Sequence, residues 1–201
     1  MTIYYKDNAF YNDDLGDVPA GAVEISDAQH AELLAALNAG SLILPDLSVT
    51  PPRPSALHTW DGKTWVLDKA AAQAHKAAQQ EEMWTRIKAK REVQRYGGAY
   101  IPALKKWLQT DEPSRTQYLQ LQLLEAKGLF KQPVRWKTMD NSFIGLDAAA
   151  VTAIALQIMD NEQADFANAE RHRAAMLKAD NPLDYAYSDG WTANYATAAE
   201  R

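Results

Sequence analysis

The stretch Gly97-Gly98-Ala99-Tyr100-Ile101-Pro102 decides how the carboxyl half of this chain is organised. Two consecutive glycines end a long helical pattern, because glycine readily adopts the left-handed conformation with which many helices terminate. No Gly-Lys-Ser/Thr follows them, so the pair lacks the sequence of a phosphate-binding loop. We therefore predict a helix that stops at Gly97-Gly98, followed by a β-like segment over residues 99–109.

Asp111 is placed to cap the next helix, which we expect to end at Gly128. Glu112 and Pro113 would lie in its first turn, where an acid and a proline are both favourable. Arg115 follows Asp111 by four residues on the same helix. The two form either a binding site for a polar partner or a helix cap with a surface ion pair, and the second interpretation is favoured because such pairs contribute little energy.

A hairpin and a long helix complete the predicted α+β carboxyl domain, residues 97–181. Short apolar segments flank the turn Met139-Asp140-Asn141, which is typical of two antiparallel strands. Asp147 follows at the position of a helix cap. Asn181-Pro182 ends that helix, because proline cannot continue it.

Residues 1–67 predict a small β-rich amino domain that contains one helix. Short aromatic segments alternate with polar turns near its start, which favours a hairpin. The helix opens at Ser26-Asp27 and ends at Asn38-Ala39-Gly40. Asp61-Gly62, between two tryptophan-containing segments, is the clearest hairpin signal, since it supplies the two left-handed positions of a tight turn.

Residues 68–96 predict a long connecting helix, because they are rich in Ala, Gln, Glu, Lys and Arg and contain no Pro or Gly. The apolar stripe of this helix is thin: alanines are followed by Trp84 and Ile87, and Arg91 occupies the next apolar position. A helix this polar buries little surface alone. We expect it to join the domains or to mediate self-association, and not to be a core helix of either domain.

The amino domain has more aromatic residues than so small a core needs, so some are expected at the surface, where Tyr and Trp often dominate binding energy. Strand edges in the same domain would suit pairing with a β-rich partner. The tail, residues 182–201, is also aromatic but unpatterned, and it either folds back over its own helix or docks on a partner. The predicted partner-binding residues are Tyr4, Tyr5, Phe10, Tyr11, Trp60, Trp65, Tyr187 and Trp191.

Composition excludes several function classes. The 201 residues carry a net charge of -5, which argues against nucleic acid or anionic membranes as partners. There is no Cys, which excludes disulfides and thiol nucleophiles and fits a reducing cytoplasm. The four His residues lack metal-ligand spacing, and no apolar run approaches the ~20 residues of a membrane span. We assign no catalytic residue, metal or cofactor, and we expect a protein that is not an enzyme.

Three amino-terminal segments resemble the opening domain of phage tail fibre assembly proteins. They are Tyr4-Tyr5-Lys6-Asp7-Asn8-Ala9-Phe10-Tyr11, Val18-Pro19-Ala20-Gly21-Ala22-Val23-Glu24-Ile25-Ser26 and Trp60-Asp61-Gly62-Lys63-Thr64-Trp65. Residues 91–177 resemble an uncharacterised module of phage tail proteins. Its marks are Gly-Gly after a basic helix, a Trp followed by Thr-Asp and Ser-Arg, and the run Trp136-Lys137-Thr138-Met139-Asp140.

The resemblance implies a chaperone that binds the distal end of a trimeric tail fibre protein in the host cytoplasm and promotes its folding, trimerisation and assembly. The second half of the chain departs from the commoner assembly proteins. A permanent component that stays on the virion, where it caps the fibre or contacts the host surface, therefore remains the alternative.

Overall fold

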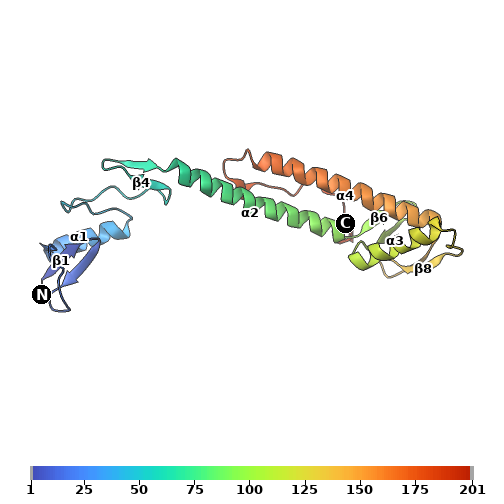
Figure 1. Ribbon diagram of the computed structural model, residues 1–201, viewed down its shortest axis with the longest axis horizontal. Coiled ribbons are helices and arrows are strands. Elements are labelled where there is room, and N and C mark those ends of the chain that lie inside the picture. Colours follow the sequence, from blue (N-terminus) through green and yellow to red (C-terminus); the bar gives the residue numbers. More distant parts are fainter. Residues whose placement is uncertain (1, 200–201) are drawn as a thin grey trace. The chain divides into compact units, whose positions relative to one another are not determined.

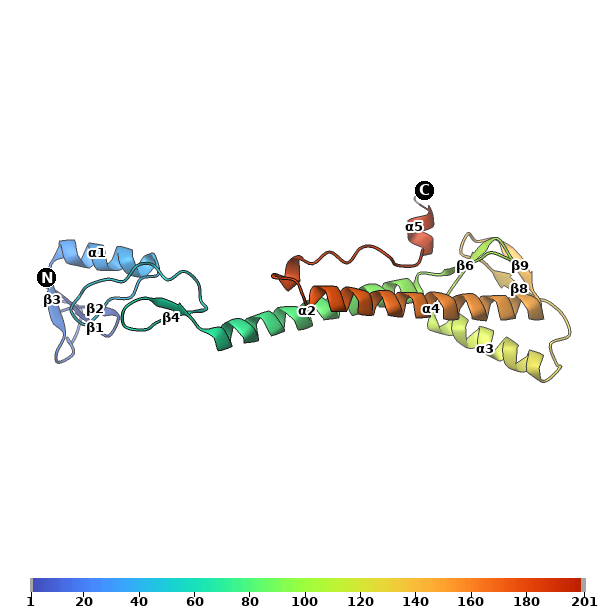
Figure 2. The ribbon, with the colours of Figure 1, turned by 90° about the horizontal axis from the view of Figure 1, so that it is seen from above.

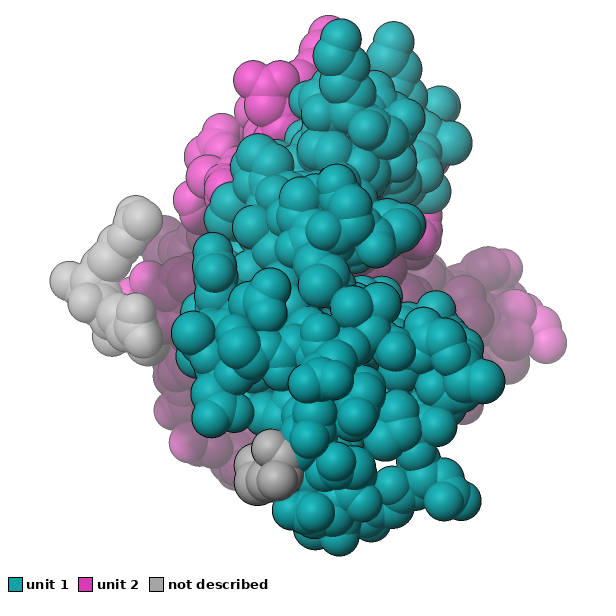
Figure 3. Space-filling model, turned by 90° about the vertical axis from the view of Figure 1, so that its left-hand side faces the viewer, with its two compact units in different colours: residues 1–74 teal, residues 75–201 magenta. Residues whose placement is uncertain are grey.

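The computed structural model describes residues 2–199 and has an α+β fold (Figure 1). The described residues fall into two compact units, whose boundary lies between Ala74 and His75 (Figure 3). Each unit has a hydrophobic core of its own. The two units are therefore described one after the other.

The amino unit is built on a three-stranded antiparallel sheet with the order β2-β1-β3. The central strand β1 (Ile3–Lys6) pairs with β2 (Ala9–Asn12) on one side and β3 (Val23–Ile25) on the other. A two-residue turn, Asp7-Asn8, joins β1 to β2, and both of its residues have positive φ angles, 47° and 62°. The predicted amino-terminal hairpin is therefore confirmed.

Helix α1 (Asp27–Asn38) packs on this sheet through Leu33. The residue before it, Ser26, accepts a hydrogen bond from the Gln29 backbone, and the Gln29 side chain accepts one from the Ser26 backbone. These reciprocal bonds satisfy two donors that a helix start leaves free, which explains why α1 begins where the sequence predicts. A separate hairpin, β4 (His58–Trp60) and β5 (Trp65–Leu67), confirms that Asp61-Gly62 lies between two strands. The expected tight turn with two left-handed positions was wrong, because the loop spans residues 61–64 and within it only Gly62 has a positive φ, 98°.

The carboxyl unit combines long helices with two hairpins (Figure 2). In chain order its elements are α2 (Lys69–Tyr96, which begins in the amino unit), β6 (Ala99–Ile101), β7 (Lys106–Leu108), α3 (Glu112–Ala126), β8 (Val134–Lys137), β9 (Phe143–Leu146), α4 (Ala148–Met176), the 3-10 helix η1 (Pro182–Asp184) and α5 (Tyr195–Ala199). Its main core joins both hairpins to α3 and α4 through Ile101, Leu108, Leu121, Leu146 and Ile154.

The predicted β-like segment 99–109 is itself a hairpin, so this unit has two hairpins and not one. The tight turn between β6 and β7 includes Lys105 with a φ of 52°, an unusual conformation for a residue with a side chain. No Gly or Asn-Gly marks that turn, which is why the sequence did not reveal it. The Met139 backbone N–H donates to the Trp107 carbonyl at 3.0 Å and joins the two hairpins.

Helix α2 contributes to a hydrophobic core, contrary to the expectation for residues 68–96. Met83 and Ile87 are 1% and 0% exposed, and they form a second core with Ala169 and Met176 of α4. The two helices run alongside each other in both views of the ribbon (Figures 1 and 2). The prediction that this helix is not a core helix was wrong, because a thin apolar stripe is enough when its partner helix supplies matching side chains.

Candidate functional site

The aromatic residues of the first hairpin lie on opposite faces of the sheet. Tyr4 stands directly across from Tyr11, and Tyr5 across from Phe10. Since side chains alternate along a strand, Tyr4 and Tyr11 point away from the face that carries buried Ile3 and Tyr5. Both Tyr4 and Tyr11 are half-buried, so each presents part of its ring at the surface.

Tyr5 does not provide a binding surface. It is 7% exposed, and its hydroxyl donates to Asn8 Oδ1 at 2.9 Å. Burial raises the pKa of this hydroxyl above its usual value. Phe10 packs against both Tyr5 and His30, with ring centroids 5.3 Å and 4.6 Å apart. Phe10 is half-buried, so of Tyr5 and Phe10 only Phe10 presents part of its ring at the surface.

A surface hollow of about 340 Å³ lies beside strand β2. The predicted residues Phe10 and Tyr11 line it together with Ile3, Asn12, Leu15, Gly16, Asp17 and His30. Leu15 is 86% exposed, and β2 is an edge strand that pairs with β1 alone. Edge strands offer unpaired backbone groups to an incoming strand. This hollow and edge together make the first candidate site, which we call the β2 edge site.

Trp60 and Trp65 form a second aromatic pair across the β4–β5 hairpin. Their rings meet edge to face, with centroids 5.5 Å apart. Trp65 Nε1 donates to the Pro51 carbonyl at 2.7 Å, and the Arg53 guanidinium lies over its ring. The indole N–H of Trp60 is buried and has no partner among the described residues. Both rings are half-buried, and Trp65 holds the proline-rich segment against the hairpin.

The tail folds back over its own helices, which decides between the two alternatives left open by the sequence. Tyr187 and Trp191 pack against the core formed by α2 and α4. Trp191 stacks on His172 with ring centroids 5.7 Å apart, and its Nε1 donates to the Tyr187 carbonyl at 2.7 Å. His172 is fully buried and also bonds the Tyr185 hydroxyl at 2.9 Å. Tyr187 and Trp191 therefore complete the carboxyl core.

Polar contacts fix the end of the tail. The backbone N–H and the hydroxyl of Thr192 donate to the two carboxylate oxygens of Asp165, at 2.8 Å and 2.7 Å. Asn194 Nδ2 donates to Gln94 Oε1 at 2.6 Å, and both side chains are buried. These bonds satisfy polar groups that would be costly to bury without a partner.

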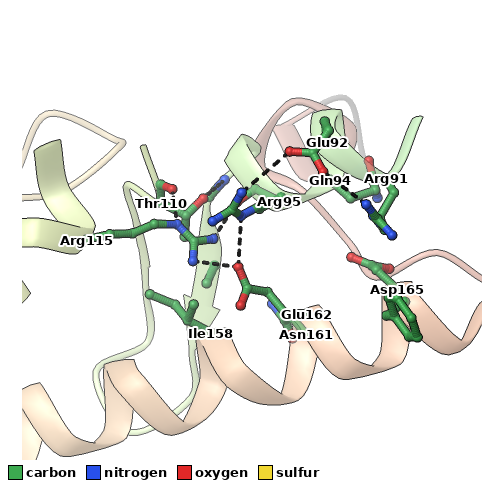
Figure 4. A pocket seen from close by; sticks show the side chains of 13 residues that line it. Arg91, Glu92, Gln94, Arg95, Thr110, Arg115, Ile158, Asn161, Glu162 and Asp165 are labelled. Carbon is green, nitrogen blue, oxygen red and sulfur yellow. Dashed lines mark hydrogen bonds and ion pairs between the residues drawn. The ribbon is translucent and has the colours of Figure 1, made fainter. Parts of the chain in front are cut away.

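A pocket of about 260 Å³ opens in the carboxyl unit between α2, the β6–β7 hairpin and α4 (Figure 4). Glu162 lines this pocket, and its Oε1 accepts hydrogen bonds from Arg115 NH1 at 2.6 Å and Arg95 Nε at 3.1 Å. The lining residues named in Figure 4 are Arg91, Glu92, Gln94, Arg95, Thr110, Arg115, Ile158, Asn161, Glu162 and Asp165.

The expected surface ion pair between Asp111 and Arg115 was wrong, because Arg115 pairs with Glu162 instead. The Arg115 side chain is 16% exposed and crosses to α4, where it bonds Glu162. The same guanidinium donates to the Thr110 carbonyl at 2.5 Å and to the Arg95 carbonyl at 2.9 Å. Asp111 instead caps α3 by accepting from the Ser114 N–H at 2.8 Å, as predicted. The four-residue spacing of Asp111 and Arg115 suggested a pair within one helix. The long Arg115 side chain instead reaches Glu162 on α4.

The pocket is lined by three arginines and three carboxylates, so its formal charges balance. Glu162 is held by two arginines, and Asp165 is held by Thr192. Arg91 lies over the Phe166 ring, 5.6 Å from its centroid. The arrangement therefore ties α2, α3 and α4 together. Sequence reasoning missed Arg95 and Glu162, because they come from separate helices and follow no motif.

The residues that mark the carboxyl resemblance converge on one place in the fold. The Gly98 N–H donates to Thr110 Oγ1 at 3.0 Å. A Cβ on Gly98 would overlap the Met139 sulfur, and its φ of +87° also requires glycine. Lys106 Nζ bonds Asp140 Oδ2 at 2.7 Å. These residues hold the two hairpins against the end of α2, which is a structural role.

Two further features bear on function. Within residues 2–199, no group of three or more His, Asp or Glu side chains is arranged to hold a metal ion. None of the helices in the same range combines the length and apolarity that a membrane crossing requires.

Comparison with known proteins gives one match. A family model described as a domain of unknown function (DUF4376) matches residues 77–189. No curated protein and no solved structure matches the chain. The matched region begins within α2, contains both hairpins, α3 and α4, and ends at Asp189 in the tail. Since it covers more than half of the 201 residues, the chain belongs to this family of uncharacterised domains.

Proposed function

We propose that this protein is an assembly factor for a phage or prophage tail fibre, and that its amino unit binds the β-rich distal end of the fibre protein. The observation that carries the proposal is the β2 edge site, where an edge strand adjoins a mainly apolar hollow with Leu15 exposed beside it. Strand addition at such an edge provides main-chain hydrogen bonds, and the adjoining hollow provides side-chain selectivity.

A trimeric β-rich fibre gives a physical reason for such a factor. Its strands pair over long sequence distances, so it folds slowly and exposes strand edges until the trimer closes. A partner that covers those edges reversibly lowers the concentration of chains free to mispair, by mass action and without ATP. This role requires a binding surface and no catalytic group.

Co-expression with a candidate fibre protein in a bacterial cytoplasm tests the proposal. We expect soluble fibre trimer when the two are expressed together and mainly aggregate when the fibre protein is expressed alone. The double variant Tyr11→Ala/Leu15→Gln should lose the effect, because both side chains line the hollow. The matched control is Val66→Thr, which changes an exposed apolar residue elsewhere in the same unit.

Equal yields of trimer with and without this protein would contradict the proposal. Equal activity of the double variant and the wild type would keep an assembly role but reject the β2 edge site. Stoichiometric recovery of the protein on purified particles would favour the alternative, a permanent component that caps the fibre.

A further inference from the structure

The outer edge of strand β2 has backbone groups that are open to an added strand. The Asp13 N–H donates to the Thr2 carbonyl at 3.3 Å, so the backbone at Asp13 points toward the neighbouring strand. Because this direction alternates along a strand, the backbone groups of Phe10 and Asn12 point away from β1. The Asn12 carbonyl accepts from the Leu15 N–H at 3.1 Å. Within the described residues, no partner occupies the Asn12 N–H or either backbone group of Phe10.

The hollow of the β2 edge site lies on the face of the sheet that α1 covers (Figure 2). Phe10 and Asn12 line it from β2, Ile3 from β1 and His30 from α1. Residues directly opposite each other in paired strands have their side chains on the same face. In a strand added to β2, the side chains opposite Phe10 and Asn12 would therefore point to the hollow. Ile3 and Phe10 make this space suitable for apolar side chains.

The rim of the hollow is acidic. Asp17 lines it, is exposed, and has no hydrogen-bond or ion-pair partner among residues 2–199. Residues 13–17 contain three Asp and no Lys or Arg, and residues 1–74 contain ten Asp and Glu against four Lys and Arg. A surface with this charge attracts a basic segment and repels an acidic one.

We infer that the β2 edge site takes an extended segment in which apolar residues alternate with Lys or Arg. This inference rests on the proposed function and adds the chemistry of the bound segment. The backbone of the segment bonds Phe10 and Asn12, its apolar side chains enter the hollow, and a basic side chain lies beside Asp17.

The strand edges of β-rich proteins fit this description. Natural edge strands often carry Lys, because a charge at the edge discourages pairing with other strands. An acidic rim beside an open strand edge removes that obstacle for a basic strand and keeps it for an acidic one. The site would thus select incompletely assembled chains whose exposed edges carry Lys.

Fluorescence anisotropy of the full chain with short labelled peptides tests the inference. The first peptide alternates lysine with valine, the second has glutamate in place of each lysine, and the third has the composition of the first with its lysines grouped at one end. We expect the first to bind with a dissociation constant on the order of 100 µM and the other two about tenfold more weakly. Amide hydrogen exchange followed by NMR should show that the first peptide protects the Phe10 and Asn12 N–H groups.

A charge reversal locates the bound segment. Asp17→Lys should weaken binding of the first peptide by about tenfold and strengthen binding of the second, because it reverses the charge at the rim. Glu24→Lys is the matched control, since it makes the same change on β3, the opposite edge of the same sheet. It should bind both peptides like the wild type. Circular dichroism checks that both variants are folded.

Equal binding of the first two peptides would overturn the inference, and so would binding that leaves the Phe10 and Asn12 amides unprotected. A larger effect of Glu24→Lys than of Asp17→Lys would reject β2 in favour of β3. If no peptide binds but co-expression still gives soluble fibre trimer, the assembly role stands and the segment chemistry is wrong. If the first peptide binds as expected but the fibre protein gains nothing, the segment chemistry stands and the tail fibre is rejected as the partner.

Discussion

Arg115 NH1 lies 2.6 Å from Glu162 Oε1, and this ion pair ties the first turn of α3 to the middle of α4. The Arg115 side chain is only 16% exposed. By contrast, the Glu82–Arg86 pair on α2 has the same 2.6 Å separation, but both side chains are about half exposed, at 54% and 49%. The two pairs therefore have the same separation, but Arg115 is far more buried than Arg86, while Glu162 is still 40% exposed.

Arg115→Ala should lower the free energy of unfolding of the carboxyl unit by about 2 kcal/mol, since Glu162 loses one of its two arginine partners and the Thr110 and Arg95 carbonyls lose a charged donor. Arg86→Ala, the matched control, should cost about 0.5 kcal/mol or less, because exposed pairs are well screened. Urea unfolding followed by tryptophan fluorescence measures both. Equal costs for the two variants would contradict the interpretation of Arg115.

Asp111→Ala should destabilise α3 by about 1 kcal/mol, because the Ser114 N–H loses its acceptor. Asp111→Asn should retain most of the stability, since Asn is an equally good cap. Thermal melting of the two variants measures the difference, and a pull-down should show fibre binding unchanged in both. Loss of binding without a change in melting temperature would instead identify Asp111 as part of a binding site.

Gly97→Ala should release the end of the tail. The new Cβ would lie 2.5 Å from the Asn194 Cβ, which is too close for that contact to persist, and a tight 3.0 Å from the Val93 carbonyl oxygen. We expect cleavage by chymotrypsin near Trp191 to accelerate by about tenfold, because local opening becomes easier. Gly145→Ala is the control, since its Cβ would meet only Pro133 at an ordinary 3.4 Å. Unchanged cleavage of Gly97→Ala would refute this role of Gly97.

Asp140→Asn should remove a pH-dependent contribution to stability. The Lys106 ammonium, followed by the Thr138 and Ser142 side chains, holds the pKa of Asp140 well below its usual value. A carboxyl group with a lowered pKa in the folded state stabilises the protein above its unfolded pKa of about 3.9, and this contribution fades as the pH falls below that value. The wild type should therefore melt above the variant at pH 7, and the difference should shrink toward pH 2. A difference that is independent of pH would exclude the charge of Asp140 as its cause.

Local signals in the sequence determined where most elements begin and end. Ser26, Asp111 and Asp147 cap helices as predicted, because a short acceptor side chain satisfies a free N–H within its own turn. Gly97-Gly98 ends α2, and Asp61-Gly62 and Met139-Asp140-Asn141 lie between paired strands. Each of these signals depends on residues a few positions apart, so it can be recognised without knowledge of the fold.

Only the tertiary structure decided which surfaces are buried and which side chains meet. The tail packs on its own helices, Met83 and Ile87 join a core, and Arg115 pairs with Glu162 across 47 residues of chain. These contacts depend on small and long side chains from distant segments fitting together in space, and nothing in the local pattern encodes that fit. The sequence therefore determined the elements, whereas packing between distant elements determined the carboxyl pocket and the hollow beside β2.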